Sequence, residues 1–284
     1  MPIFIQIKVK DRYRLFKNVK RNINSSWNKF YPSLKISRSM FFNYLSGRYN
    51  LPQDIFLKMQ KIAGIKIDDY RVINSDRYVK KDIPEPKMSV KLAEIIGALN
   101  GDGHVSKFKY EICIVLDSRE KDYRDYLKKL CEEVFGTPFT LFIEPGKVKI
   151  RTYSIDISNM LIKKYGLPKG NKIGKLKIPE MILKTEELLV PYIRGLFDTD
   201  GSFYIRRKKD PVIEITSADP KFLIEVKNAL ISLNFHVAKG VNRIFIYKKE
   251  DINKFFSVIK PANTKHLKKH QNYLNLISAS GLMA

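Results

Sequence analysis

Two stretches of the chain have apolar residues at helical spacing, and strand-like segments follow each of them. The stretches are Val90–Gly103 and Leu188–Gly201. Apolar positions every three to four residues indicate a helix, and alternating apolar and polar positions indicate a strand. After each stretch the pattern predicts two strands, a helix, two further strands and another helix. The predicted helices are Tyr123–Phe135 and Ile155–Tyr165 in the first copy and Lys221–Leu233 and Glu250–Ile259 in the second, and the second strand pairs are Phe139–Ile143 with Val148–Tyr153 and Val237–Lys239 with Arg243–Tyr247.

The two copies align with an offset of 98 residues, which pairs Asp102 with Asp200 and Gly97 with Gly195. This period is too long for a solenoid repeat, so we expect a duplicated unit that folds as one pseudo-symmetric domain. The predicted fold class is α+β. Two αββαββα repeats, at residues 88–186 and 187–284, form a domain that spans residues 87–284.

The N-terminal part has helical apolar spacing between Tyr13 and Lys66. Its segment 34–48 resembles the second half of a helix-turn-helix, with Ser37 as the N-cap and Gly47 closing the helix. The residues at the start of this predicted recognition helix, where base edges are contacted, are Arg38, Ser39 and Asn43. We therefore predict a small all-α, helix-turn-helix-like, DNA-binding domain with its linker at residues 1–86, since Pro84 and Pro86 mark a linker.

The formal net charge of +24 comes from 53 Lys+Arg against 29 Asp+Glu. Hydrophobic residues make up 44% of the chain, which excludes disorder over most of its length and places the charge on folded surfaces. Residues 1–90 hold 19 Lys/Arg and 7 Asp/Glu, which is half of the net charge. A polyanionic partner is expected, with nucleic acid ahead of an anionic membrane or an acidic protein.

Cysteine content and the N-terminal sequence exclude several classes. Cys113 and Cys131 are the only cysteines, which rules out a disulfide framework or a zinc knuckle. The chain shows neither a signal-peptide apolar region nor an apolar run long enough to span a membrane. We expect a protein of the prokaryotic cytoplasm or an organelle interior, not secreted and without a membrane partner.

Both motif helices end in a carboxylate. The first reads Leu-Ala-Glu-Ile-Ile-Gly-Ala-Leu-Asn-Gly-Asp-Gly over 92–103, and the second reads Tyr-Ile-Arg-Gly-Leu-Phe-Asp-Thr-Asp-Gly over 192–201. A helix C-terminus is electronegative, so a carboxylate there is unfavourable unless a cation neutralises it. Two such ends brought together would form a divalent-metal site with hard oxygen ligands, suited to Mg²⁺. In a basic protein this chemistry points to phosphodiester hydrolysis by metal-activated water.

These motifs resemble those of the LAGLIDADG homing endonucleases in their two-motif, single-chain form, over about residues 88–284. The resemblance implies a saddle-like core that binds double-stranded DNA. It also implies Mg²⁺-dependent cleavage of both strands at a long, asymmetric target by a monomer with internal pseudo-two-fold symmetry.

The resemblance also assigns roles to individual residues. Asp102 and Asp200 would be catalytic metal ligands, and Gly101 and Thr199 would offer backbone carbonyls to the metals. Gly97 and Gly195 would lie where the two helices cross. Asn100 departs from the family pattern, which has an acid there as Asp198 does in the second copy, and this indicates unequal half-sites.

The family further uses a basic residue near each metal to position water and balance charge in the transition state. In the first copy it would lie in the Gly-rich turn before Ile178-Pro179, where we choose Lys172. In the equivalent tail of the second copy we choose Lys265. Lys175 or Lys268 could take these roles instead.

The strand after each motif is expected along the major groove, with alternate side chains facing the bases. This parity selects two sets, His104, Ser106, Phe108 and Tyr110 in the first copy and Ser202, Tyr204, Arg206 and Lys208 in the second. Arg206 is the best base-reading candidate, because a guanidinium can bond both O6 and N7 of guanine. The residues expected on phosphates, which set affinity and salt dependence, are Lys107, Lys109, Arg207 and Lys209.

Three alternatives stay open. An RNA-splicing maturase of the same fold would bind intron RNA and could dispense with the carboxylates. A transcription regulator with an inactive endonuclease core would bind DNA through the helix-turn-helix, but it would not need both acids. An endonuclease within an intein is third, although no Cys or Ser opens the chain and no His-Asn closes it. A freestanding or intron-encoded protein is therefore expected.

Overall fold

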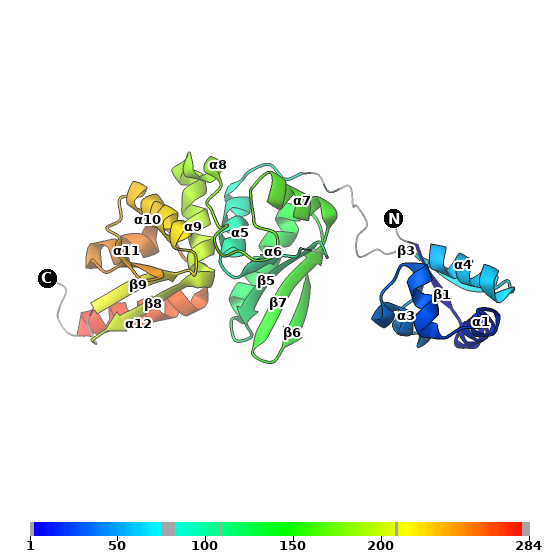
Figure 1. Ribbon diagram of the computed structural model, residues 1–284. Coiled ribbons are helices and arrows are strands. Elements are labelled where there is room, and N and C mark those ends of the chain that lie inside the picture. Colours follow the sequence, from blue (N-terminus) through cyan, green and yellow to red (C-terminus); the bar gives the residue numbers. More distant parts are fainter. Residues whose placement is uncertain (1–2, 75–82, 84, 108, 208–209, 280–284) are drawn as a thin grey trace. The chain divides into compact units, whose positions relative to one another are not determined.

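The structure is a computed structural model that describes residues 3–74, 83, 85–107, 109–207 and 210–279. The chain divides into two compact units, Met1–Val79 and Lys80–Ala284, and each is described by itself (Figure 1). None of the helices within the described ranges combines the length and the apolar character that a membrane crossing needs.

The N-terminal unit combines helices with a small antiparallel sheet, so the prediction of an all-α domain was wrong. Strands β1 (Ile3–Ile7), β2 (Leu51–Pro52) and β3 (Tyr70–Asn74) pair in the order β2-β1-β3. Ile5 and Ile7 of β1 are buried, as expected for β-branched residues that alternate along a half-buried strand. The strong helical spacing of residues 13–66 obscured the short strands at its two edges.

The helices of this unit are α1 (Val9–Asn22), α2 (Trp27–Phe30), the 3₁₀ turn η1 (Tyr31–Leu34), α3 (Arg38–Leu45) and α4 (Gln53–Ala63). They enclose an aromatic core in which the Phe41 ring lies 5.1 Å from that of Trp27 and 6.0 Å from that of Phe16. Ser37 caps α3, because its hydroxyl accepts a hydrogen bond from the Met40 amide at 3.2 Å. Gly47 follows the helix with φ +81°, a conformation that favours glycine.

The second unit contains the two αββαββα repeats, and the predicted fold class is confirmed for it. Repeat one is α5 (Val90–Asn100), β4 (Gly103–Val105), β5 (Glu111–Asp117), α6 (Lys121–Phe135), β6 (Thr140–Glu144), β7 (Lys147–Tyr153) and α7 (Ile155–Lys163). Repeat two is α9 (Glu186–Asp200), β8 (Gly201–Arg206), β9 (Asp210–Thr216), α10 (Pro220–Ser232), β10 (Ala238–Gly240), β11 (Arg243–Ile246) and α11 (Lys249–Val258). The short helix α8 (Glu180–Leu183) precedes repeat two, and α12 (Thr264–Ala279) follows it.

The two sheets have equivalent strand orders. They are β4-β5-β7-β6 in repeat one and β10-β11-β9-β8 in repeat two, with antiparallel neighbours throughout. Along β7 every second residue is buried, beginning with Val148 and Ile150, while the residues between them are partly or fully exposed. One face of each sheet therefore packs on helices and the other is open to a partner.

The motif helices α5 and α9 lie side by side in the middle of this unit (Figure 1). Ser89 caps α5, since its hydroxyl accepts from the Leu92 amide at 3.3 Å. From Leu92 to Asn100 every residue of α5 is buried. The fold thus brings together the ends of two helices that are 98 residues apart in the sequence.

Candidate active site at the repeat interface

Glycine allows the two motif helices to touch backbone to backbone. A Cβ atom on Gly97 would stand 2.0 Å from the carbonyl oxygen of Tyr192, and one on Gly195 would stand 2.0 Å from that of Glu94. Real Cβ atoms do not approach a carbonyl oxygen so closely, so these positions require glycine. Each of the two predicted interface glycines therefore lies at a contact between α5 and α9.

The two motif ends differ in shape. Helix α9 continues to Asp200, whereas α5 ends at Asn100 and places Asp102 two residues further on. Gly101 packs against the side chain of Thr199, because a Cβ there would lie 2.0 Å from the threonine Oγ1. Thr199 is buried, and its hydroxyl donates to the carbonyls of Gly195 and Leu196. The motif ends therefore meet at Gly101 and Thr199.

The two predicted catalytic carboxylates influence one another. Burial raises the pKa of Asp200 to about 7, and the charge of Asp102 raises it further, while Lys172 and Lys265 lower it. The pKa of Asp102 is raised as well, chiefly because surrounding protein desolvates the carboxylate, although the residue keeps access to solvent. Two carboxylates in such surroundings favour a neighbouring cation.

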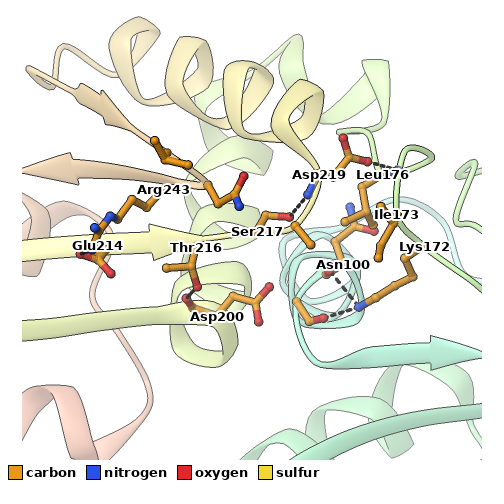
Figure 2. Close-up of a pocket in the computed structure, with 14 residues that line it drawn as sticks. Asn100, Lys172, Ile173, Leu176, Asp200, Glu214, Thr216, Ser217, Asp219 and Arg243 are labelled. Atoms are coloured by element: carbon orange, nitrogen blue, oxygen red, sulfur yellow. Dashed lines mark hydrogen bonds and ion pairs between the residues drawn. The ribbon is translucent and has the colours of Figure 1, made fainter.

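Lys172 lies at the end of α5. Its ammonium donates to the carbonyl of Asn100 at 3.1 Å and also to that of Gly101. Figure 2 shows Lys172 extending from its loop to this helix end, while the Asp200 carboxylate points toward the same space from α9. Burial lowers the pKa of Lys172, and Asp200 and Asp102 partly restore it. These residues line a pocket of about 580 Å³ that extends over the sheet of repeat two.

Lys265 approaches from the other side. Its ammonium forms an ion pair with Glu120 at 2.8 Å, and both residues line a second pocket, of about 260 Å³, together with Asp117, Arg119 and Lys268. Asp102 and Asp200 each have a lowered pKa contribution from Lys265, which places this lysine within electrostatic reach of both carboxylates. The alternatives Lys175 and Lys268 are exposed residues of the same two segments.

The structure gives a reason for Asn100 in place of an acid. Its amide nitrogen donates to the carbonyl of Lys177 at 3.1 Å and to the Tyr192 hydroxyl at 2.8 Å. The matching residue Asp198 instead accepts from the backbone amide of Ala262 at 2.7 Å. The tail of repeat one presents a carbonyl and the tail of repeat two presents an amide, so one position needs a donor and the other an acceptor.

The strand after the first motif is shorter than predicted. β4 ends at Val105, and the exposed His104 keeps the predicted parity. Ser106 is nearly buried in the turn that follows, where its hydroxyl accepts from the Lys109 amide at 3.2 Å, so it does not face outward on a strand. Lys107 and Lys109 are exposed in this turn, and Phe108 lies outside the described residues.

The strand after the second motif has the predicted parity over its length. Phe203 is buried, while Tyr204 and Arg206 are exposed and Ser202 is half-buried. The Tyr204 hydroxyl donates to Glu214 on β9 at 2.9 Å. Lys208 and Lys209 lie outside the described residues.

Further cations on these sheet faces were missed. Directly paired residues of antiparallel strands point to the same face, and the register His104–Cys113–Arg151 places Arg151 beside His104. The Arg151 guanidinium lies 4.2 Å from the centre of the Phe142 ring. Arg243 shares a face with Ser202 in the same way and lies 3.6 Å from Glu214. Alternation in the predicted strands 148–153 and 243–247 was the signal that could have identified both.

In the N-terminal unit, the predicted contact residues lie on α3. Arg38 and Ser39 are exposed, and the Arg38 guanidinium lies 5.6 Å from the centre of the Phe42 ring. Asn43 is half-buried, and its carbonyl accepts from the Tyr49 amide at 3.2 Å.

With this geometry established, similarity to known proteins identifies the domain. The sequence profile of a family described as a LAGLIDADG-like domain matches residues 187–260, which run from the second motif helix to the end of α11. The second repeat is a LAGLIDADG-like domain. The family resemblance predicted from the two motifs is thereby confirmed, and repeat one carries the same order of elements.

Curated relatives include the tRNA-splicing ligase RtcB of Pyrococcus furiosus, 25% identical over 242 residues, or 74% of this chain. A DNA polymerase of Thermococcus hydrothermalis is 24% identical over 61% of this chain. The chain spans only 25% and 10%, respectively, of the lengths of these two relatives. The crystal structure of I-DmoI in complex with DNA and Mn is similar to the LAGLIDADG-like unit at 14% identity, with a TM-score of 0.46 over 60% of this chain and 96% of that one. Other structures of I-DmoI hold Ca or Mg.

Proposed function

We propose that this chain is a site-specific endonuclease that hydrolyses both strands of duplex DNA with Mg²⁺ as its metal. The observation that carries the proposal is the meeting of Asp102 and Asp200 at the ends of two crossed helices, with Lys172 and Lys265 on either side. Carboxylates between two lysines, beneath two basic sheet faces, suit a phosphodiester group better than a neutral substrate.

The residues at this position fit a hard divalent cation. Asp102 and Asp200 supply carboxylate oxygens, and the pKa of Asp200 is raised to about 7 by burial and by the charge of Asp102, which a cation would relieve. The Gly101 carbonyl already accepts from Lys172, so within this arrangement the lysine occupies one predicted ligand. Among the described residues no three His, Cys, Asp or Glu side chains could hold a metal together, so phosphate and water oxygens would complete the coordination.

Bound Mg²⁺ would supply a Lewis acid that polarises a phosphoryl oxygen and lowers the pKa of a water molecule. The protein's part is then to hold and orient. Asp102 and Asp200 fix the position of positive charge at the helix ends. Lys172 and Lys265 place ammonium groups where negative charge develops on the phosphate.

The sheet faces would supply the reading of sequence. His104 and Arg151 lie on one sheet, and Tyr204, Arg206 and Arg243 lie on the other. Side chains that project from adjacent strands can follow the bases in the major groove. Lys107 and Lys109 in the turn after β4 would contact phosphates. Two different faces on one chain imply an asymmetric target and a monomer with internal pseudo-symmetry.

The N-terminal unit would add a second DNA contact through α3, with Arg38, Ser39 and Asn43 toward the duplex. Half of the chain's net charge lies within its first 90 residues. An additional basic unit raises affinity by linking two binding events, provided that the linker lets both units bind at once.

The relatives support the idea of a separable module. A ligase and a polymerase share no reaction, and the chain matches only a quarter and a tenth of their lengths. We infer that the matched segment is distinct from the activity that gives each of those proteins its name.

The test is selection of cleaved products from a randomised DNA library with Mg²⁺, followed by assays of Asp102→Asn and Asp200→Asn on the selected target. We expect each variant to lose at least about 100-fold in cleavage rate while it still binds the target. Asp122→Asn, which removes an exposed acid of α6, is the matched control and should cut like the wild type. Undiminished cleavage by both single variants would contradict the proposal.

A further inference from the structure

The loop that carries Lys172 crosses from repeat one to repeat two. Behind Lys172, the amide of Leu176 donates to Asp219 Oδ2 at 3.2 Å, and the amide of Ile178 donates to Glu225 at 2.9 Å. Asp219 is buried, and its other oxygen caps α10 by accepting from the amides of Lys221 and Phe222. One carboxylate therefore joins the start of α10 to the Lys172 loop (Figure 2).

The segment that carries Lys265 crosses in the opposite direction. Its ammonium forms an ion pair with Glu120 at 2.8 Å, and Glu120 is the residue at which α6 of repeat one begins. The Glu120 side chain is 14% exposed and that of Lys265 is 34% exposed, so this pair is partly shielded from solvent. Such shielding separates it from ordinary surface ion pairs, which contribute little.

The two crossings are equivalent in position. Helices α6 and α10 both follow the first strand pair of their repeat, and Glu120 and Asp219 are their N-cap residues. Each acid binds the tail of the other repeat, one through a lysine ammonium and one through a backbone amide. The equivalence extends to the inner side, where Asn100 binds Lys177 and Asp198 binds Ala262 within their own repeats.

We propose that Glu120 and Asp219 are positioning residues, each of which fixes the lysine of the opposite repeat beside the Asp102–Asp200 pair. The inference rests on the proposed endonuclease function. Since each lysine approaches the carboxylates from a different side, each acid governs one half-site. Loss of Glu120 frees the Lys265 ammonium, and loss of the second Asp219 oxygen frees the loop behind Lys172. In both cases the fold of the repeats remains.

A first experiment needs no DNA. The full chain is treated with a limiting amine-acylating reagent, and the modification rate of each lysine is measured by mass spectrometry. Glu120→Ala is expected to raise the rate at Lys265 several-fold and leave Lys172 unchanged. Asp219→Ser keeps a capping hydroxyl but lacks the oxygen that binds Leu176, so it is expected to raise the rate at Lys172 alone. Asp219→Asn keeps both oxygen roles in one amide oxygen's reach and should restore most of the protection.

Exposed Lys175 and Lys268 serve as internal standards for the reagent, and Asp122→Asn is the control for loss of an acid on α6. Unchanged rates at Lys172 and Lys265 in the two variants, or a general rise at all lysines, would overturn the assignment. This readout does not depend on cleavage, so it fails or succeeds independently of the proposed function.

A second experiment connects the contacts to the reaction. With a target selected from the DNA library, the two strands are labelled separately and their cleavage rates are compared. Glu120→Ala is expected to slow one strand about 10-fold more than the other, and Asp219→Ser to slow the opposite strand, so nicked DNA accumulates with opposite polarity. If the wild type cuts and both variants slow the two strands equally, the acids only support the fold and the positioning role is wrong.

Discussion

Gly97 packs so closely against Tyr192 that a Cβ atom would lie 2.0 Å from the Tyr192 carbonyl oxygen. The obstacle is backbone within α9, so it cannot turn away as a side chain would. We predict that Gly97→Ala separates the two motif helices and lowers the free energy of unfolding of the LAGLIDADG-like unit by more than about 3 kcal/mol. Urea unfolding followed by circular dichroism measures this.

The control is Gly146→Asn, in a turn where a Cβ meets nothing within 4 Å and φ is +75°. Asparagine tolerates this backbone conformation, so the change in stability should stay below about 1 kcal/mol. Equal losses for the two variants would show that the close approach of the helices is not what Gly97 provides.

The difference between Asn100 and Asp198 leads to a prediction of opposite sign at two equivalent positions. Asn100→Asp would place a carboxylate against the carbonyl of Lys177 and should cost about 2–4 kcal/mol. Asp198→Asn keeps an oxygen for the Ala262 amide and removes a charge that burial disfavours, so it should be neutral or stabilising by about 1 kcal/mol. Thermal unfolding of the two variants and of the wild type at pH 8 compares them. A stabilising Asn100→Asp would contradict this explanation.

The helices, the strands and the meeting of Asp102 with Asp200 could be predicted because they depend on local pattern and on the 98-residue duplication. The contacts around them could not. Asn100 and Lys177 are 77 positions apart, and no periodicity says which of them offers a donor and which an acceptor. For that reason Asn100 looked like a departure from the motif, although the structure gives it a partner.

Short strands and tails were the other gap. β1 is only five residues long, and its partner β3 lies 63 residues later along the chain, so nothing local indicated a pair. The tails of the repeats also differ, since Lys172 lies in an irregular loop and Lys265 lies in the first turn of α12. Packing decides this difference. Tyr273 and His270 of α12 lie against Phe203 on β8, and the turn around Gly174 has no comparable apolar row.

The buried His266 predicts a stability that depends on pH. Its ring packs on Phe197 at 4.4 Å, and burial, with help from Lys265 and Lys269, lowers its pKa to about 3. The unfolded chain binds a proton near pH 6.5 and the folded chain does not, so stability falls as the pH drops from about 6.5 toward 3. Between pH 7 and pH 5 the loss from this residue is about 2 kcal/mol.

His266→Phe removes the titration and keeps a ring beside Phe197. Its unfolding free energy should therefore fall less than that of the wild type between pH 7 and pH 5, by the same 2 kcal/mol or so. Urea titrations at both pH values provide the comparison, and parallel losses in the two proteins would rule out His266 as the source.

Arg151 and Lys109 are predicted to affect DNA binding in different ways. Arg151 lies on the sheet face beside His104 and stacks on Phe142, so it should read a base, and Arg151→Gln should cost about 1–3 kcal/mol at one target position and relax the preference there. Lys109 is exposed in the turn after β4 and should contact a phosphate. Lys109→Gln should then weaken all sequences alike and reduce the salt dependence of binding by about one phosphate contact. Binding to single-base variants of the target at several salt concentrations, without Mg²⁺, separates the two effects, and a uniform loss for Arg151→Gln would remove it from the reading face.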